Sequence, residues 1–178
     1  MRRQAGIAVA GLVSLAPLLA CASLGLGFAR AMPDGGRDCA GALVATQQIA
    51  GEFLLRQRVR VQGDDLDWRL TLVAQKRGDR LVVIGLDAFG GKEFVLTQQG
   101  TDVVVEHPRG RLPLPPIDLL RDLHRVRFLT AAAASEGGVT LARSEAGDVT
   151  IEHPRCGYRA TWVAIEASPP PATGDTGP

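Results

Sequence analysis

Apolar and polar residues alternate with a period of two along much of the middle of this 178-residue chain. Between residues 66 and 75 the apolar side chains fall on one face of an extended chain and the polar ones on the other: Leu66, Trp68, Leu70, Leu72 and Ala74 against Asp67, Arg69, Thr71 and Gln75. Residues 55–61 repeat the pattern. A strand with one buried face and one wet face requires this alternation, so the chain is expected to be mainly β.

Turn signals separate these alternating segments. Residues 63–65 (Gly-Asp-Asp) and 77–79 (Arg-Gly-Asp) predict tight hairpin turns. Further strands are expected at 81–86, 93–97, 103–107, 139–143, 149–152 and 158–166. Closely spaced turns of this kind predict consecutive antiparallel hairpins and exclude alternating β-α-β units.

One segment must leave the sheet. Residues 112–116 contain three prolines, which cannot donate hydrogen bonds inside a sheet. Pro116 suits the first turn of a helix, and Ile117, Leu120 and His124 then recur at helical spacing. The pattern predicts an amphipathic helix of about three turns with a polar side facing solvent. The alternative is a helix that merely closes the open end of a β-barrel.

The first twenty residues have the three parts of a secretory signal peptide. Arg2 and Arg3 form a basic start, residues 5–19 are uncharged and apolar, and the sequence Leu-Leu-Ala then leads to Cys21. This last segment resembles the bacterial lipobox, in which a peptidase cleaves before a lipid-modified Cys. We therefore expect residues 1–20 to be removed and Cys21 to carry lipid, including palmitate.

Two alternatives remain open for this region. Residues 29–31 (Ala-Arg-Ala) could be a cleavage site that releases a soluble protein. Residues 5–28 are also long enough to stay as a transmembrane anchor. The lipobox is favoured because the apolar segment ends where Cys21 stands.

The cysteine count fits a lipid on Cys21. Three Cys is an odd number for an exported protein. If Cys21 is acylated, Cys39 and Cys156 remain as a possible pair in an oxidising compartment. A disulfide over so long a loop could contribute about 4–5 kcal/mol in the chain-entropy model. The alternative is two free thiols.

Composition sets the domain boundaries. Residues 21–40 are rich in Gly and are expected to be a flexible tether, 41–167 form the folded domain, and 168–178 form a Pro-rich, disordered tail. Ala22 follows Cys21, whereas in enterobacteria an Asp there retains lipoproteins in the inner membrane. The sequence therefore favours the outer membrane, with the domain facing the periplasm.

Several function classes lack a signature. Removing Arg2 and Arg3 leaves 18 of the 20 basic residues against 19 acidic ones, so no basic surface for nucleic acid is expected. His107 and His153 each follow a Glu, but no further ligands stand at metal-site spacing, and both are expected to be solvated strand ends. No nucleophile elbow, phosphate loop or zinc-protease motif occurs. We expect no enzyme, cofactor or metal.

Two stretches resemble a known family. Residues 84–91 (IGLDAFGG) and 94–97 (FVLT) resemble the strand, glycine hairpin and strand of the outer-membrane lipoprotein receptor LolB. Residues 112–123 (LPLPPIDLLRDL) resemble the Pro-rich run and helix that come after them in that family. The similarity covers residues 53–128, with a looser fit at 158–166. It is closer still to an uncharacterised group of LolB-related lipoproteins found with aryl-polyene or fatty-acid-type biosynthesis genes.

This resemblance implies an incomplete antiparallel β-barrel whose apolar concave face is covered by one amphipathic helix. In LolA and LolB such a cavity takes up acyl chains, and a leucine on the LolB hairpin helps to pass cargo on. Phe89 occupies the matching position, and the alternative for its ring is packing over the sheet edge. Trp68, Leu70 and Leu120 are the other candidate contacts for lipid or cargo. The implied function is a membrane-anchored lipoprotein that binds or transfers an acyl chain, lipid or lipoprotein at the outer membrane, without catalysis.

The alternative is a structural or interaction lipoprotein that docks an envelope partner and has a barrel filled by its own side chains. Residues that point inward distinguish the two. Small residues such as Ala74, Gly85 and Ala160 would leave room for a ligand, whereas large residues throughout would fill the space.

Overall fold

The computed structural model describes Cys39 and residues 41–106 and 112–168. The signal peptide, Cys21, most of the expected tether and His107 lie outside the described residues. So does the expected tail beyond residue 168.

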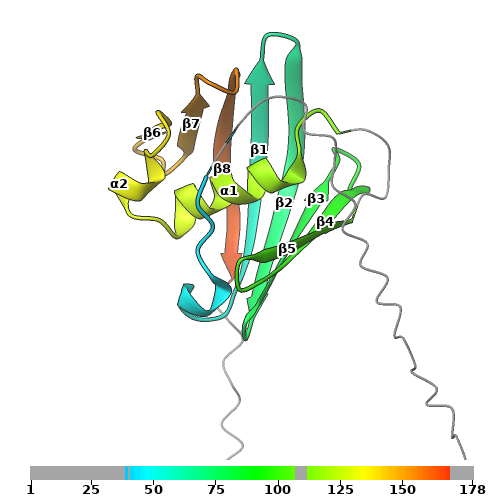
Figure 1. Ribbon diagram of the computed structural model, residues 1–178. Helices are drawn as coiled ribbons and strands as arrows, with labels where there is room; N and C mark the ends of the chain where they lie inside the picture. The colour runs from blue at the N-terminus through cyan, green and yellow to red at the C-terminus, as the bar shows by residue number, and fades with distance from the viewer. Residues whose placement is uncertain (1–38, 40, 107–111, 169–178) are drawn as a thin grey trace, which may run out of the picture. The chain divides into compact units, whose positions relative to one another are not determined.

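The described residues form a mainly β structure with all strands antiparallel in one sheet, as the alternation predicts. The eight strands are β1 (Phe53–Gly63), β2 (Leu66–Arg77), β3 (Arg80–Leu86), β4 (Lys92–Gln99), β5 (Asp102–Glu106), β6 (Thr140–Arg143), β7 (Val149–His153) and β8 (Tyr158–Ser168). Their order in the sheet is β5-β4-β3-β2-β1-β8-β7-β6, with β5 and β6 as edges (Figure 1). The sheet is open and does not close into a barrel.

Two meanders, β1 to β5 and β6 to β8, are joined where β1 pairs with β8. The turns within the first meander agree with the predicted signals. Gly63 pairs with Leu66 across the first turn, and Gly78 has a φ of 55° in the second, a conformation that favours glycine. A register shift in the β1–β8 pairing falls between Arg56 and Gln57.

The core lies between one face of the sheet and helix α1 (Pro116–Arg127). Pro116 stands at the start of α1, as predicted, and Phe128 caps its end, where the Phe128 N–H donates to the carbonyl of His124. The Leu119, Leu120 and Leu123 side chains are fully buried. In Figure 1, α1 crosses in front of the central strands. Polar contacts tie it to β4 on one side and to β7 and β8 on the other.

Two short helices were not predicted. The 3-10 helix η1 (Thr46–Gln48) is attached to the turn between β4 and β5, where the Thr46 N–H donates to the carbonyl of Gly100 at 3.0 Å. Helix α2 (Ala131–Ala134) comes after α1 and is capped by the Thr130 hydroxyl, which accepts a hydrogen bond from the Ala133 N–H. Both are about one turn long, too short for a periodic pattern to reveal them.

Candidate functional site

The turn between β3 and β4 carries the most exposed large apolar side chain of the described residues. Phe89 is 98% exposed. The carboxylate Oδ1 of Asp87 accepts hydrogen bonds from the N–H groups of Phe89 and Gly91, each at 2.8 Å. The main chain closes the turn, because the Asp87 N–H donates to the carbonyl of Gly91 at 2.9 Å. Gly90, with a φ of 81°, supplies the left-handed conformation that the turn needs.

These bonds hold the turn without any help from the Phe89 ring. The Asp87 carboxylate and the main chain fix the backbone, as in other Asx turns, while the ring stays in water. Burying such a side chain would add about 1.5–3 kcal/mol to the free energy of unfolding, and the exposed Phe89 ring does not contribute it. The turn therefore presents the Phe89 ring to solvent on a fixed backbone, and the ring does not pack over the sheet edge.

The other candidate contacts lie elsewhere. Trp68, Leu70 and Leu120 are 8%, 4% and 0% exposed and belong to the core between β2 and α1. The Trp68 indole Nε1 donates to the Glu93 carboxylate at 3.0 Å, and its ring lies 6.4 Å from that of Phe94. The structure thus places these three side chains inside the packed core and only Phe89 at the surface.

One of the small inward residues, Gly85, is covered by a side chain of the protein itself. A Cβ atom added at Gly85 would collide with the ring of Phe94, which lies directly over this glycine. Ala74 and Ala160 are 2% and 0% exposed, within the same core. At Gly85, where the sequence left room for a ligand, a side chain of the protein itself fills the position.

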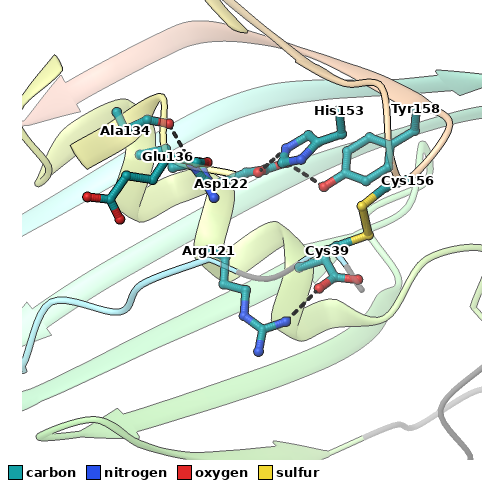
Figure 2. A network of polar contacts seen from close by, with 10 residues as sticks. Cys39, Arg121, Asp122, Ala134, Glu136, His153, Cys156 and Tyr158 are labelled. Carbon is teal, nitrogen blue, oxygen red and sulfur yellow. Dashed lines mark hydrogen bonds and ion pairs between the residues drawn. A yellow bond between two sulfur atoms is a disulfide. The ribbon is translucent and has the colours of Figure 1, made fainter. Parts of the chain in front are cut away.

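A buried polar network connects α1 to β7 and β8 (Figure 2). Asp122, 0% exposed, receives a hydrogen bond from the Tyr158 hydroxyl at 3.0 Å and lies 2.7 Å from Nε2 of His153. The rings of His153 and Tyr158 stack at 4.4 Å. Burial, and after it the charge of Asp122, raises the pKa of Tyr158 above its ordinary value, so the hydroxyl stays protonated as a donor.

The disulfide stands beside this network. Cys39 and Cys156 are joined, with their Cα atoms 5.7 Å apart, so the structure contains the bridge that the cysteine count suggested (Figure 2). Cys156 lies in the turn between His153 and Tyr158, where its N–H donates to the His153 carbonyl. The bridge attaches the start of the described chain to the β7–β8 turn.

A second polar network holds the other side of α1. His124, 0% exposed, accepts the Val44 N–H at Nδ1 (2.9 Å), so its proton is on Nε2, which donates to Oε1 of Gln98 at 2.9 Å. The Gln98 amide in turn donates to the carbonyls of Val44 and Gly100. Burial lowers the pKa of His124 to about 4, so the ring is neutral near pH 7.

Sequence reasoning missed both networks. The polar side of the helix was expected to face solvent, but Asp122 and Arg125, which belong to it, are buried. His153, expected at a solvated strand end, is also buried. Asp118 is buried too, and burial raises its pKa although Arg121 donates to it at 2.9 Å. One feature of the sequence could have indicated these buried polar groups: the helix has many charged residues, yet it also has to cover the sheet. A polar helix face normally indicates solvent, and here tertiary contacts override that rule.

Both networks join α1 to the sheet. Their side chains are buried and hydrogen-bonded to one another, so their polar groups are satisfied within the fold. Among the described residues no group of three or more His, Cys, Asp or Glu is arranged to hold a metal ion. No helix in the described part of the chain is long and apolar enough to span a membrane. The candidate for contact with another molecule is Phe89, because its ring is exposed on a fixed turn.

Comparison with known proteins finds no family model that matches the chain and no curated protein that matches its sequence. The functional interpretation accordingly depends on the geometry of the Phe89 turn and on the packing of the core.

Proposed function

We propose that this protein is a membrane-anchored lipoprotein of the bacterial envelope that binds or transfers an acyl chain, a lipid or a lipoprotein at the outer membrane without catalysis. The observation that carries the proposal is the exposure of Phe89, 98%, on a turn fixed by Asp87. Cys21 supplies the anchor, and the domain faces the periplasm.

The physical case rests on the cost of exposing an aromatic ring. Single exposed apolar residues are common, but a ring at the tip of a turn whose backbone is already fixed can enter an apolar layer without reorganising the fold. An aromatic side chain also suits the boundary between water and hydrocarbon. Phe89 is thus a contact for acyl chains that requires no catalytic group.

The proposal also includes a more specific fold than an open sheet. We interpret the open sheet and α1 as an incomplete barrel of the LolA and LolB kind, with α1 as its cover. Trp68, Leu70 and Leu120 would then meet an acyl chain only after α1 moves off the sheet, since all three are now buried. Asp122 and His124 oppose that movement through their contacts with β4, β7 and β8. Contact at the surface through Phe89 requires no such opening.

A second function is favoured by a different observation. The Phe94 ring fills the space over Gly85, which fits an interaction lipoprotein whose barrel is packed with its own side chains. In that case Phe89 contacts an envelope protein instead of a lipid.

Native mass spectrometry of the protein purified from membranes separates the two. We expect the wild-type protein to retain an acyl-containing molecule in addition to its own anchor, and Phe89→Glu to retain much less. Val104→Glu is the matched control, because Val104 is also exposed (60%) but lies on the edge strand β5. No bound acyl compound on the wild-type protein would favour the interaction protein.

A further inference from the structure

The face of the sheet opposite α1 has a groove with a volume of about 640 Å³. Its lining comes from β1, β2, β8 and the β3–β4 turn, and three arginines contribute to it: Arg58, Arg60 and Arg69. Side chains alternate between the two faces of a strand. Because Val59 and Leu70 point into the core, these arginines point away from it.

The arginines are close to one another. Arg60 on β1 pairs directly with Arg69 on β2, and like charges in such a position repel. Asp67 offsets part of this repulsion, since its carboxylate holds Arg60 with two bonds of 2.8 and 2.9 Å and lies 3.5 Å from Arg69. The Arg69 side chain remains 67% exposed. One carboxylate thus serves two guanidinium groups, and positive charge is left over.

Arg58 adds a third positive charge to the groove. It is exposed, and its neighbours across the strands are Thr71 and Val163, neither of which carries charge. No carboxylate whose side chain the structure describes pairs with Arg58. The groove can therefore accept an anion from outside the chain.

The groove and the exposed ring belong to the same turn. Asp87 and Ala88 form one wall of the groove, and Phe89 is the next residue along the chain. The Asp87 carboxylate, the one acidic group in that lining, already accepts two main-chain N–H bonds. A positively charged groove adjoining an apolar tip matches a molecule with an anionic head and an apolar chain.

We propose that this groove binds the phosphate headgroups of anionic phospholipids while Phe89 enters the acyl layer of the same membrane. The inference depends on the lipid contact proposed above for Phe89 and adds the class of lipid. Guanidinium groups suit phosphate because their planar N–H donors match its oxygens in pairs. A basic residue close to an anionic membrane surface strengthens binding roughly fivefold.

The first test monitors the tip itself in the processed full-length protein. Phe89→Trp is reconstituted into vesicles of phosphatidylcholine alone or with phosphatidylglycerol, and quenching by lipids brominated on the acyl chain is measured. The signal of the protein without this substitution is subtracted, because Trp68 and Trp162 are native and buried. We expect stronger quenching with phosphatidylglycerol, and a decrease as salt is added, since salt screens exposed charges.

Arginine variants then test the groove. In the Phe89→Trp background, Arg58→Gln with Arg69→Gln should lower tip insertion into phosphatidylglycerol vesicles at least fivefold and remove the difference between the two lipids. Arg60 is left intact because its bond with Asp67 joins β1 to β2. The matched control is Arg77→Gln with Arg80→Gln, an exposed and directly opposed pair at the other end of β3, which should change nothing.

Four results would overturn the inference. Equal quenching in both lipids, or unchanged quenching in the Arg58 and Arg69 variant, would show that Phe89 inserts without the groove and would leave the proposed function intact. Equal losses in the control pair would show that net charge acts without a defined site. No quenching in any vesicle would reject the lipid contact of Phe89 as well.

Discussion

The ring of Phe94 lies directly over Gly85, in the space that a side chain at position 85 would need. The two residues pair across β3 and β4, next to a register shift in that pairing. The contact explains why the interior is filled although the sequence has small residues there. A glycine in the interior of a strand weakens it unless something packs closely against the backbone, as Phe94 does here.

Gly85→Ala should therefore destabilise the protein. The new Cβ would force the Phe94 ring to move, and overpacking of this kind costs about 1–3 kcal/mol. Phe94→Leu in the same chain should recover part of the loss by making room, although alone it should be destabilising. Urea unfolding of the three variants measures this. A neutral Gly85→Ala would show that the interior has spare space, as a ligand cavity would.

Stability should fall in acid partly through His124. Its folded pKa of about 4 lies below the ordinary value of 6.5, so between these pH values the unfolded chain binds more protons than the folded one. Stability contributed by the neutral ring is complete above about pH 6.5 and is lost as the pH falls toward 4, by roughly 3 kcal/mol at most. His124→Gln should flatten this part of the stability profile.

Subtracting the two pH profiles isolates His124. Asp118 acts in the opposite direction. Burial raises its pKa, so as the pH falls the folded state binds this proton at a higher pH than the unfolded chain does. Asp118 is present in both proteins, so its effect cancels in the difference. Parallel profiles for wild-type and His124→Gln protein would contradict the assignment.

The pairing of Cys39 with Cys156 predicts a simple labelling pattern. In protein taken from the periplasmic side without reductant, an alkylating reagent should modify neither thiol, and both should react after reduction and unfolding. Replacing both by Ser should lower stability by up to about 4–5 kcal/mol, since the bridge closes a long loop. Full labelling without reductant would show two free thiols instead.

Lipidation of Cys21 is tested by a single substitution. Cys21→Ser should abolish labelling with radioactive palmitate and leave unprocessed precursor, because the lipobox peptidase requires the modified Cys. Cys39→Ser, measured alongside, should keep the label. Normal cleavage at Ala31 in the Cys21→Ser protein would support a conventional signal peptide.

The sequence predicted the features that depend on neighbouring residues. Alternation from Leu66 to Ala74 identified β2 and its buried face, and Pro116 identified the start of α1. The pairing of β1 with β8 could not be predicted, because about a hundred residues separate strands whose edges carry no matching signal.

For the candidate site, too, the sequence indicated what depends on neighbouring residues and not what depends on distant ones. Phe89 stands between turn residues, which suggested exposure, but packing over the sheet edge was an equal alternative until the structure showed the ring 98% exposed. Asp122 and His153 are polar residues that become buried only because each supplies the other with a partner, and such a pairing is invisible in one sequence. Trp68 and Leu70 were correctly placed on the inward face of β2, but the helix that covers that face decides whether a ligand reaches them.

The central claim is that Phe89 contacts lipid, and liposome association of the protein produced without its N-terminal anchor tests it most directly. Phe89→Glu should change stability by less than about 0.5 kcal/mol, because the ring is 98% exposed, yet weaken association several-fold. Val104→Glu should leave association unchanged. A large fall in melting temperature for Phe89→Glu, with liposome binding unaltered per folded molecule, would contradict the account.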